Sequence, residues 1–184
     1  MRVIAGKAKG HQLKVPKGRV IRPATDLVRG AIFSILETMV SDWSLVLDLF
    51  AGSGALGIEA LSRGAGWVDF VDYKPRCCDI IRQNLEKTKL AAQAHIYCCS
   101  VAKAISFLDR EYNIIIMDPP YSNSSIGGVV LRLATSRLVG VSSTVVVTHS
   151  PHLSLNPVYA PLNLIKERRH GDSCIAVYQM EGKL

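Results

Sequence analysis

Asp118, Pro119 and Pro120 directly follow an apolar run at residues 113–117, which predicts a buried strand ending at the acid. A carboxylate and a backbone carbonyl held together could accept hydrogen bonds from both N–H groups of an exocyclic amine on a nucleic-acid base. Such an amine is a poor nucleophile because its lone pair is delocalised into the ring, and these acceptors favour a pyramidal nitrogen. Proline fixes φ at about −65°, so the turn would hold both acceptors in one shape.

Tyr121 completes the motif and offers a flat face on which a base could stack, worth roughly 1–3 kcal/mol per base. Asp-Pro-Pro-Tyr after a strand is typical of enzymes that methylate an exocyclic base amine. The alternative for a lone Pro-Pro is a tight turn with a solvent-exposed tyrosine. A second motif upstream favours the first interpretation.

That motif is a predicted strand, a glycine-rich turn and an apolar helix, with Gly52-x-Gly54-x-x-Gly57 at its centre. The spacing satisfies the dinucleotide fingerprint, and glycine permits a sharp turn and close backbone approach to a ligand. The spacing does not choose between a dinucleotide and S-adenosylmethionine (SAM). Asp48 favours SAM, because a carboxylate there could meet a ligand ammonium and would repel a pyrophosphate.

Asp72 ends the next predicted strand, 15 residues beyond Gly57 (72 − 57). A carboxylate in this place can hold both ribose hydroxyls of SAM or of NAD. The alternative is a helix cap ahead of Pro75.

Length and composition indicate a single domain over residues 1–184, with a basic N-terminal extension at 1–24 and a catalytic core at 25–184. No apolar run of 18 residues and no signal-peptide pattern are present, so we expect a cytoplasmic protein without a membrane span. Five cysteines lack any C-x-x-C pair, and we interpret them as packed, reduced thiols without a metal site.

The net charge of +7 is concentrated near the N-terminus. Residues 1–30 hold eight Lys or Arg and one Asp (8 − 1 = +7), which leaves 14 basic and 14 acidic residues in the remainder. A basic segment on a neutral body predicts a nucleic-acid contact, with a solubilising tail as the alternative.

Strand and helix patterns alternate along the chain, which predicts an α/β fold with a mostly parallel sheet. A short hairpin is expected from residues 2–5 and 12–15, followed by a helix that Thr25 or Asp26 would cap. The remaining expectations are strands at 45–50, 67–71, 94–98, 113–117, 143–148, 161–168 and 173–180, and helices at 56–63, 75–88, 101–108 and 127–138. Four polar residues would converge at the carboxyl edge of this sheet, where ligands bind: Asp48, Asp72, Ser100 and Asp118.

The chain resembles the RsmD-type 16S rRNA (guanine-N2) methyltransferases over nearly its whole length. The resemblance rests on the opening residues 2–10 and 13–16, the Arg-Pro segment 22–29, and the motifs at 48–54, 59–65 and 118–121. It implies a Rossmann-like class I SAM-dependent fold, with a mostly parallel seven-stranded sheet, helices on both faces and the basic hairpin extension.

The resemblance also implies transfer of a methyl group from SAM, leaving S-adenosylhomocysteine, to the 2-amino group of a guanine in small-subunit rRNA. Naked rRNA and the assembling small subunit are both open as substrates, and a monomer is the simplest assembly. Catalytic roles fall to Asp118, Pro119, Pro120 and Tyr121. Cofactor contacts fall to Asp48, Phe50, Ala51, Gly52, Ser53, Gly54, Asp72, Tyr73, Ser100 and Val101. RNA contacts fall to Lys7, Lys9, Arg22 and Arg29, with no metal.

Three positions depart from the family pattern. Ser100 stands where the family usually has an Asp that bonds the adenine amino group, and Ala24 replaces a threonine. Thr148-His149 stands where members often carry a Glu. We expect His149 to be a surface histidine, with a substrate contact as the alternative.

Two other functions remain open. A DNA adenine-N6 or cytosine-N4 methyltransferase could use the same site, although the chain shows no second recognition domain. An NAD-binding oxidoreductase or a non-catalytic nucleotide-binding module would explain the glycine-rich turn, but neither Asp-Pro-Pro-Tyr nor the basic segment.

Overall fold

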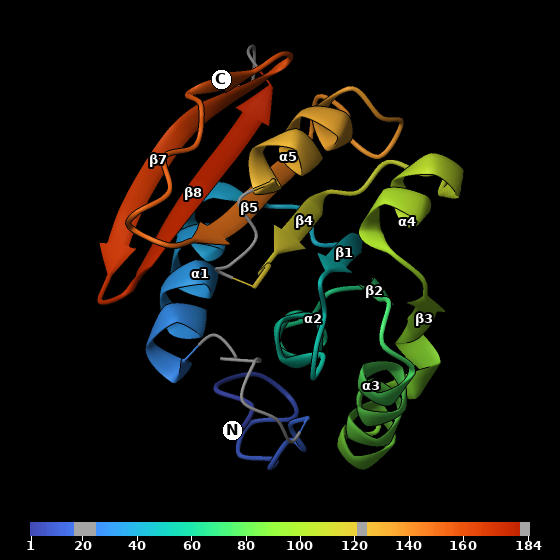
Figure 1. Cartoon of the computed structure of the whole chain (residues 1–184). Helices are drawn as coiled ribbons and strands as arrows, with labels where there is room; N and C mark the ends of the chain where they lie inside the picture. The colour runs from blue at the N-terminus through green and yellow to red at the C-terminus, as the bar shows by residue number, and fades with distance from the viewer. Residues whose placement is uncertain (17–24, 121–124, 181–184) are drawn as a thin grey trace.

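A computed structural model describes residues 1–16, 25–120 and 125–180 (Figure 1). Its centre is one eight-stranded sheet in the order β3-β2-β1-β4-β5-β8-β7-β6. The five strands from β3 to β5 are parallel, and β8, β7 and β6 continue the sheet with antiparallel pairings. The strands are β1 (Leu45–Leu49), β2 (Trp67–Asp72), β3 (Ala94–Cys98), β4 (Ile114–Met117), β5 (Thr144–His149), β6 (Val158–Tyr159), β7 (Leu162–His170) and β8 (Ser173–Met180).

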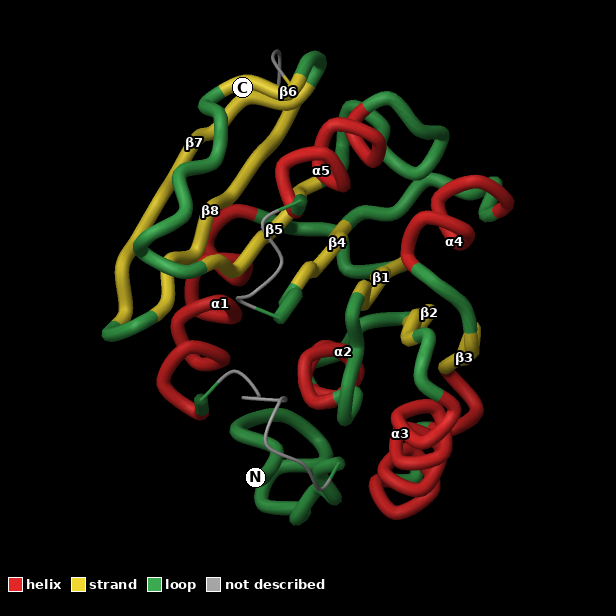
Figure 2. Tube along the Cα trace, viewed as in Figure 1, coloured by secondary structure: helices red, strands yellow, loops and turns green. Residues whose placement is uncertain are grey.

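Helices cover both faces of the sheet, as Figure 2 shows. One apolar core joins the first three helices to one face, and a second core joins the last two to the other. The helices are α1 (Asp26–Met39), α2 (Ala55–Ser62), α3 (Pro75–Thr88), α4 (Val101–Phe107) and α5 (Ile126–Ala134), with a 3-10 turn η1 (Ala91–Gln93) before β3.

The local signals in the sequence explain most element boundaries. Thr25 caps α1, where its side chain accepts a hydrogen bond from the backbone N–H of Val28 at 3.3 Å. Pro75 is the first residue of α3, a position where proline's missing N–H costs nothing. β4 is buried along its whole length between β1 and β5, as its continuous apolar run predicts.

Two expectations about the elements were wrong. The sheet has eight strands instead of seven, because the two-residue β6 pairs with the start of β7, and so short a segment has no detectable period. The helix expected at 127–138 ends at Ala134, with Thr135 as its C-cap.

The N-terminal segment (residues 1–16) is a docked part of the fold. Arg2 and Gln12 form an isolated β-bridge, and backbone hydrogen bonds flank it from Val3 N–H to the His11 carbonyl and from Leu13 N–H to the Met1 carbonyl, both at 3.0 Å. The expected hairpin is therefore present as a short pairing near the N-terminus. Beyond it, the backbone N–H groups of Ile4, Ala5 and Ala8 donate to side chains of α2. Val3, Ala8 and Leu13 are buried in the same core as α1, α2 and α3.

The five cysteines are free thiols. Cys98 is exposed, so the expectation that all five are packed was wrong for this residue. The described residues contain no cluster of three or more His, Cys, Asp or Glu side chains suited to a metal ion. No helix in the described ranges is long and apolar enough to cross a membrane.

Candidate active site

Three carboxylates lie at the carboxyl ends of three neighbouring strands. Asp48 is the fourth residue of β1, Asp72 is the last residue of β2, and Asp118 follows the last residue of β4. β1 is the middle strand, and its register places Leu49 opposite both Val71 of β2 and Met117 of β4. Parallel strands lie about 4.8 Å apart, so the three acids share one small region of the sheet edge.

The glycine-rich turn between β1 and α2 has the backbone that its sequence predicts. Phe50, Gly52 and Gly54 have φ of 62°, 57° and 76°, all in the left-handed region. For a non-glycine residue such as Phe50 this conformation costs about 1–3 kcal/mol, and such strain is concentrated at ligand sites. The turn is tied to β2 because the Gly52 N–H donates to Asp72 Oδ2 at 2.9 Å.

Gly57 has a packing role. A Cβ at this position would lie 2.3 Å from the ring of Phe70, so only glycine lets α2 pack this closely on β2. The Gly57 N–H also donates to Asp48 Oδ2 at 2.9 Å. The third glycine of the fingerprint therefore fixes the first acid of the site.

Asp48 is fully buried, and its second oxygen, Oδ1, has no hydrogen-bond partner among the described residues. Burial raises the pKa of this carboxyl to about 8, with the Gly57 bond opposing the rise and the nearby Asp118 and Asp72 charges adding to it. An unpartnered buried carboxylate oxygen is costly unless a ligand supplies a donor. Asp48 therefore fits a cationic group of a bound cofactor.

Asp72 is buried and uses both carboxylate oxygens: Oδ2 accepts from Gly52, and Oδ1 accepts from the Lys74 N–H at 2.9 Å. It is not the N-cap of α3, since that position belongs to Lys74. Tyr73 is 62% exposed next to it, with Lys74 Nζ 5.3 Å from its ring centre. A flat aromatic face is thus open at the edge where an adenine is expected.

Asp118 lies just beyond β4 and is half-buried. The hydroxyl of Thr148, near the end of β5, donates a hydrogen bond to Asp118 Oδ1. Pro119 is buried and Pro120 is exposed, and Tyr121 lies outside the described residues. The structure therefore places the acid and the following carbonyl at the same edge as Asp48.

Ser100 caps α4, where its side chain accepts from the Lys103 N–H at 3.2 Å. Ser100 is exposed and Val101 is buried. They follow β3, the strand beyond β2, at the same carboxyl edge. Their proposed contact with the adenine stays a prediction.

Arg29 was expected to contact RNA phosphate, and that expectation was wrong. Its side chain is fully buried, and Nη2 donates to the Arg2 carbonyl and to Asp26 Oδ1, both at 2.7 Å. Nη1 lies 4.0 Å from Glu59 Oε2. Arg29 thus joins α1 to the N-terminal segment and α2. Lys7 and Lys9 are exposed as expected, and Arg22 lies outside the described residues.

His149 was expected on the surface, and this was also wrong. The side chain is only 3% exposed, with Nδ1 3.0 Å from the Ser150 carbonyl and Nε2 3.1 Å from Glu167 Oε1 of β7. The sheet pairing brings Glu167 to it from a strand 18 residues away in the sequence. His149 therefore connects β5 to the antiparallel end of the sheet.

Two residues near the site were not assigned a role from the sequence. Thr148 was noted only as a departure from the family pattern, although the rule that selected Asp118 also applies to it, since both are polar residues at strand ends. Asn84 has no such signal: from α3 it bonds the carbonyls of Lys14 and Ser53, each at 2.9 Å, and accepts from the Lys14 N–H at 2.8 Å. It fixes the N-terminal segment next to the glycine-rich turn.

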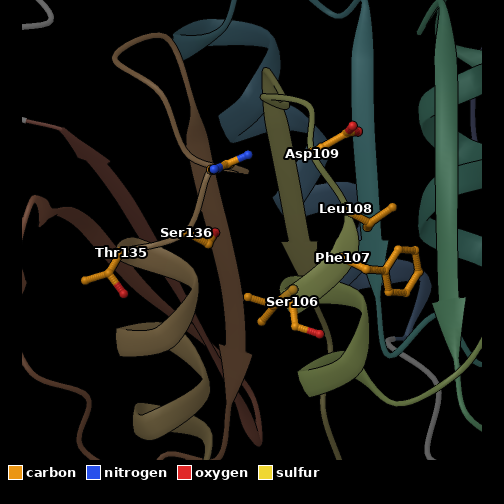
Figure 3. Close-up of a pocket in the computed structure, with 8 residues that line it drawn as sticks. Ser106, Phe107, Leu108, Asp109, Thr135 and Ser136 are labelled. Carbon is orange, nitrogen blue, oxygen red and sulfur yellow. The ribbon is translucent and has the colours of Figure 1, made fainter.

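A surface pocket of about 430 Å³ lies away from this site, between the C-terminal ends of α4 and α5 (Figure 3). These helix ends precede β4 and β5, so the pocket belongs to the opposite edge of the sheet. Its lining comprises Ile105, Ser106, Phe107, Leu108, Asp109, Thr135, Ser136 and Arg137.

Comparison with known proteins supports the family resemblance that the sequence motifs indicate. The model of the family described as Conserved hypothetical protein 95 matches residues 1–179. Ribosomal RNA small subunit methyltransferase D of Escherichia coli (strain K12) is 31% identical over 186 residues, covering 100% of this chain and 91% of the relative. The same-named protein of Haemophilus influenzae is 29% identical, covering 97% of this chain and 93% of its own.

Solved structures give the same result for the fold. A conserved hypothetical protein from Streptococcus pyogenes has a TM-score of 0.79 at 33% identity, covering 85% of this chain and 98% of that one. The Rossmann-like class I methyltransferase fold expected from the sequence is confirmed. The chain belongs to the Conserved hypothetical protein 95 family, which is the RsmD family that its motifs resemble.

Proposed function

We propose that this protein is a SAM-dependent methyltransferase that modifies the N2 amine of a guanine in small-subunit rRNA. The observation that carries the proposal is the position of Asp118-Pro119 beyond β4, one strand from the buried, unpartnered oxygen of Asp48. Asp48 would bind the cofactor, and Asp118 would bind the amine of the base. The relatives named as small-subunit rRNA methyltransferases support RNA as the substrate.

The residues present fit SAM. Asp48 Oδ1 needs a donor, which the ammonium of the methionine part offers. The turn at residues 50–54, left-handed at Phe50, Gly52 and Gly54, would let the backbone approach that part closely. Asp72 would bind the ribose, Tyr73 would lie against the adenine, and Ser100 and Val101 would border it. When bound, SAM supplies an electrophilic methyl group on a sulfonium centre.

The protein's own contribution would be positioning and electrostatics. Asp118 and the Pro119 carbonyl accept hydrogen bonds from the guanine amine and stabilise the positive charge that develops on its nitrogen. Thr148 holds the carboxylate in place for this task. Holding nitrogen and methyl carbon in a near-attack geometry supplies much of the acceleration.

The target base must leave any stack to reach Asp118, at a cost of a few kcal/mol. Stacking on Tyr121 would offset part of this cost. The exposed Lys7 and Lys9 of the N-terminal segment would offset more by contacting phosphates.

Methyl transfer from radiolabelled SAM to three substrates tests the proposal: unmodified small-subunit particles, naked small-subunit rRNA, and DNA. We expect N2-methylguanosine from RNA or particles after nucleoside analysis. Label in DNA would instead identify an adenine-N6 or cytosine-N4 methyltransferase. Stabilisation by NAD and not by SAM would identify the oxidoreductase or nucleotide-binding alternative, since a ligand at 100 times its Kd adds about 2.7 kcal/mol.

The variant Asp118→Ala tests whether this acid holds the reacting amine. It should bind SAM nearly as well as the wild type does, because Asp48 and Asp72 remain, and it should lose methyl transfer. Turnover near the wild-type rate would show that Asp118 does not hold the reacting amine.

A further inference from the structure

We propose that the exposed basic end of β7 is a second contact surface for the RNA backbone, separate from the N-terminal segment. This basic end comprises Lys166, Arg168, Arg169 and His170. The inference rests on the proposed RNA substrate and extends it, because the sequence alone indicated only one basic region.

Sheet register places this surface at the catalytic edge. β7 is antiparallel to β8, and β8 is antiparallel to β5, so β7 and β5 run in the same direction. Thr148 of β5 and Arg168 of β7 are both paired with Ile175 of β8. Because Thr148 also bonds Asp118, one line across the sheet runs from Asp118 through Thr148 and Ile175 to Arg168. With strands about 4.8 Å apart, Arg168 lies on the order of 14 Å from Asp118.

The charges at this end are available to a partner. Arg168 and Arg169 are exposed, and in the described parts of the chain no ion pair joins Lys166, Arg168 or Arg169 to an acid. The Glu167 carboxylate, between them in sequence, lies instead at hydrogen-bond distance from Nε2 of the buried His149. Residues 166–172 carry three Lys or Arg and two acids, so the segment has a net charge of +1 without His170.

The side chains are also spread over both faces of the strand. Arg168 pairs with Ile175, which belongs to the core under α1, so Arg168 lies on that face of the sheet. Arg169 pairs with Cys174 and therefore lies on the opposite face. Beyond the short β6 pairing, which ends at Asn163, no strand of the described residues lies on the outer side of β7. A polyanionic backbone could therefore approach the two arginines from the free edge of the sheet.

The arrangement puts a basic surface on each side of the reacting acid. The N-terminal segment is bonded to α2 and α3, which pack on the β1–β3 half of the sheet. β7 lies in the other half, beyond β5 and β8, with β4 between the two halves. A phosphate backbone held at two places would present the intervening base to Asp118. Two-sided contact would also limit how the RNA can rotate about the site.

Charged side chains on an edge strand also block pairing with another sheet, which is the competing role for the same residues. The two roles differ in their measurable effects. An RNA contact changes the affinity and its salt dependence, whereas edge protection changes self-association.

The test uses the full-length double variant Arg168→Gln/Arg169→Gln and the control Arg110→Gln/Arg137→Gln. The control loses the same charge from exposed arginines that precede β4 and β5, at the opposite edge. Binding to small-subunit rRNA is measured over a range of salt concentrations, together with methyl transfer and the midpoint of unfolding.

For the β7 variant we expect Kd for RNA to rise about tenfold and the slope of log K against log salt to flatten by about 1.4, at roughly 0.7 per lost phosphate contact. The turnover rate at saturating RNA and the affinity for SAM should match those of the control. An RNA affinity and salt slope equal to the control's, with or without new self-association, would overturn the proposal. If the wild type methylates no RNA, it is the proposed function that fails.

Discussion

At the scale of single residues, the hydrogen bond from Thr148 to Asp118 has a consequence for the rate of transfer. Thr148→Val keeps the buried shape and removes the donor, so the Asp118 carboxylate can turn away from the reacting amine. We expect the turnover rate to fall about ten- to a hundredfold, since small misplacements of a reacting group have effects of this size. Steady-state kinetics with RNA and SAM would measure this.

Thr148→Ser is the matched control, because it retains the hydroxyl. It should recover most of the rate, and the KM for SAM should be unchanged in both variants. Equal rates for the valine and serine variants would contradict a positioning role.

Asp48 predicts a pH dependence of cofactor binding. Its pKa of about 8 means that burial stabilises the neutral form in the ligand-free protein, and this contribution to folding is lost as the pH rises from about 4 to about 8. A ligand ammonium requires the charged form. The affinity for SAM should therefore increase with pH, by up to about tenfold per unit below pH 8, and stop rising once Asp48 is charged and the ligand ammonium begins to lose its proton.

Titration calorimetry between pH 6 and pH 9 would measure this. In Asp48→Asn the affinity should be weaker and nearly independent of pH over the same range. An unchanged pH profile in the asparagine variant would mean that another group titrates.

At the scale of elements, Glu59 holds the N-terminal segment on the core. Its carboxylate accepts from the N–H groups of Ile4 and Ala5 at 2.7 and 3.0 Å and from Arg63 Nε at 2.8 Å, close to Arg29. Glu59→Ala leaves the Ile4 and Ala5 N–H groups without their acceptor and removes one of the two carboxylates near the buried Arg29, which keeps Asp26. We expect a loss of about 3–5 kcal/mol of unfolding free energy. Urea denaturation measures this loss.

Glu37→Ala is the control, because Glu37 also pairs with Arg63 but is 52% exposed. Its effect should stay below about 1 kcal/mol. In Glu59→Ala, limited proteolysis should also cut within residues 1–16 faster than in the control. Equal protection in the two variants would show that other contacts hold the segment.

The elements themselves were largely predictable, and their long-range contacts were not. The strands and helices of the parallel half follow periodic apolar patterns with local caps such as Thr25. By contrast, the bonds from Ile4 and Ala5 to Glu59 span 55 and 54 residues, and no local pattern encodes them. Arg29 is an intermediate case: it precedes Ile32, Phe33 and Leu36 at helical spacing, so the period of α1 does indicate that it faces the core.

In the candidate site, too, the positions along the chain were predictable and the long-range contacts were not. Strand-end position was sufficient to find Asp48, Asp72 and Asp118, because parallel strands end at a common edge. By contrast, His149 contacts Glu167 of β7, a strand whose pairing the sequence does not specify. Packing partners of the site therefore required the structure.

At the scale of the whole molecule, docking of the N-terminal segment changes how its role in RNA binding must be tested. Val3, Ala8 and Leu13 belong to the core, so deleting the segment would destabilise the fold as well as remove charge. Lys7 and Lys9 are exposed and can be replaced without removing buried side chains from that core. The double variant Lys7→Gln/Lys9→Gln isolates the charge, with Arg110→Gln/Arg137→Gln as the control for equal loss of charge elsewhere.

If both lysines meet phosphates, the slope of log K against log salt should flatten by about 1.4 to 1.8, at roughly 0.7–0.9 per contact. Because the segment and the basic end of β7 lie on different halves of the sheet, their effects on the slope should add in a combined variant. RNA binding across a salt series would measure both. A combined slope no flatter than that of either double variant would mean that the two surfaces do not contact the same RNA at the same time.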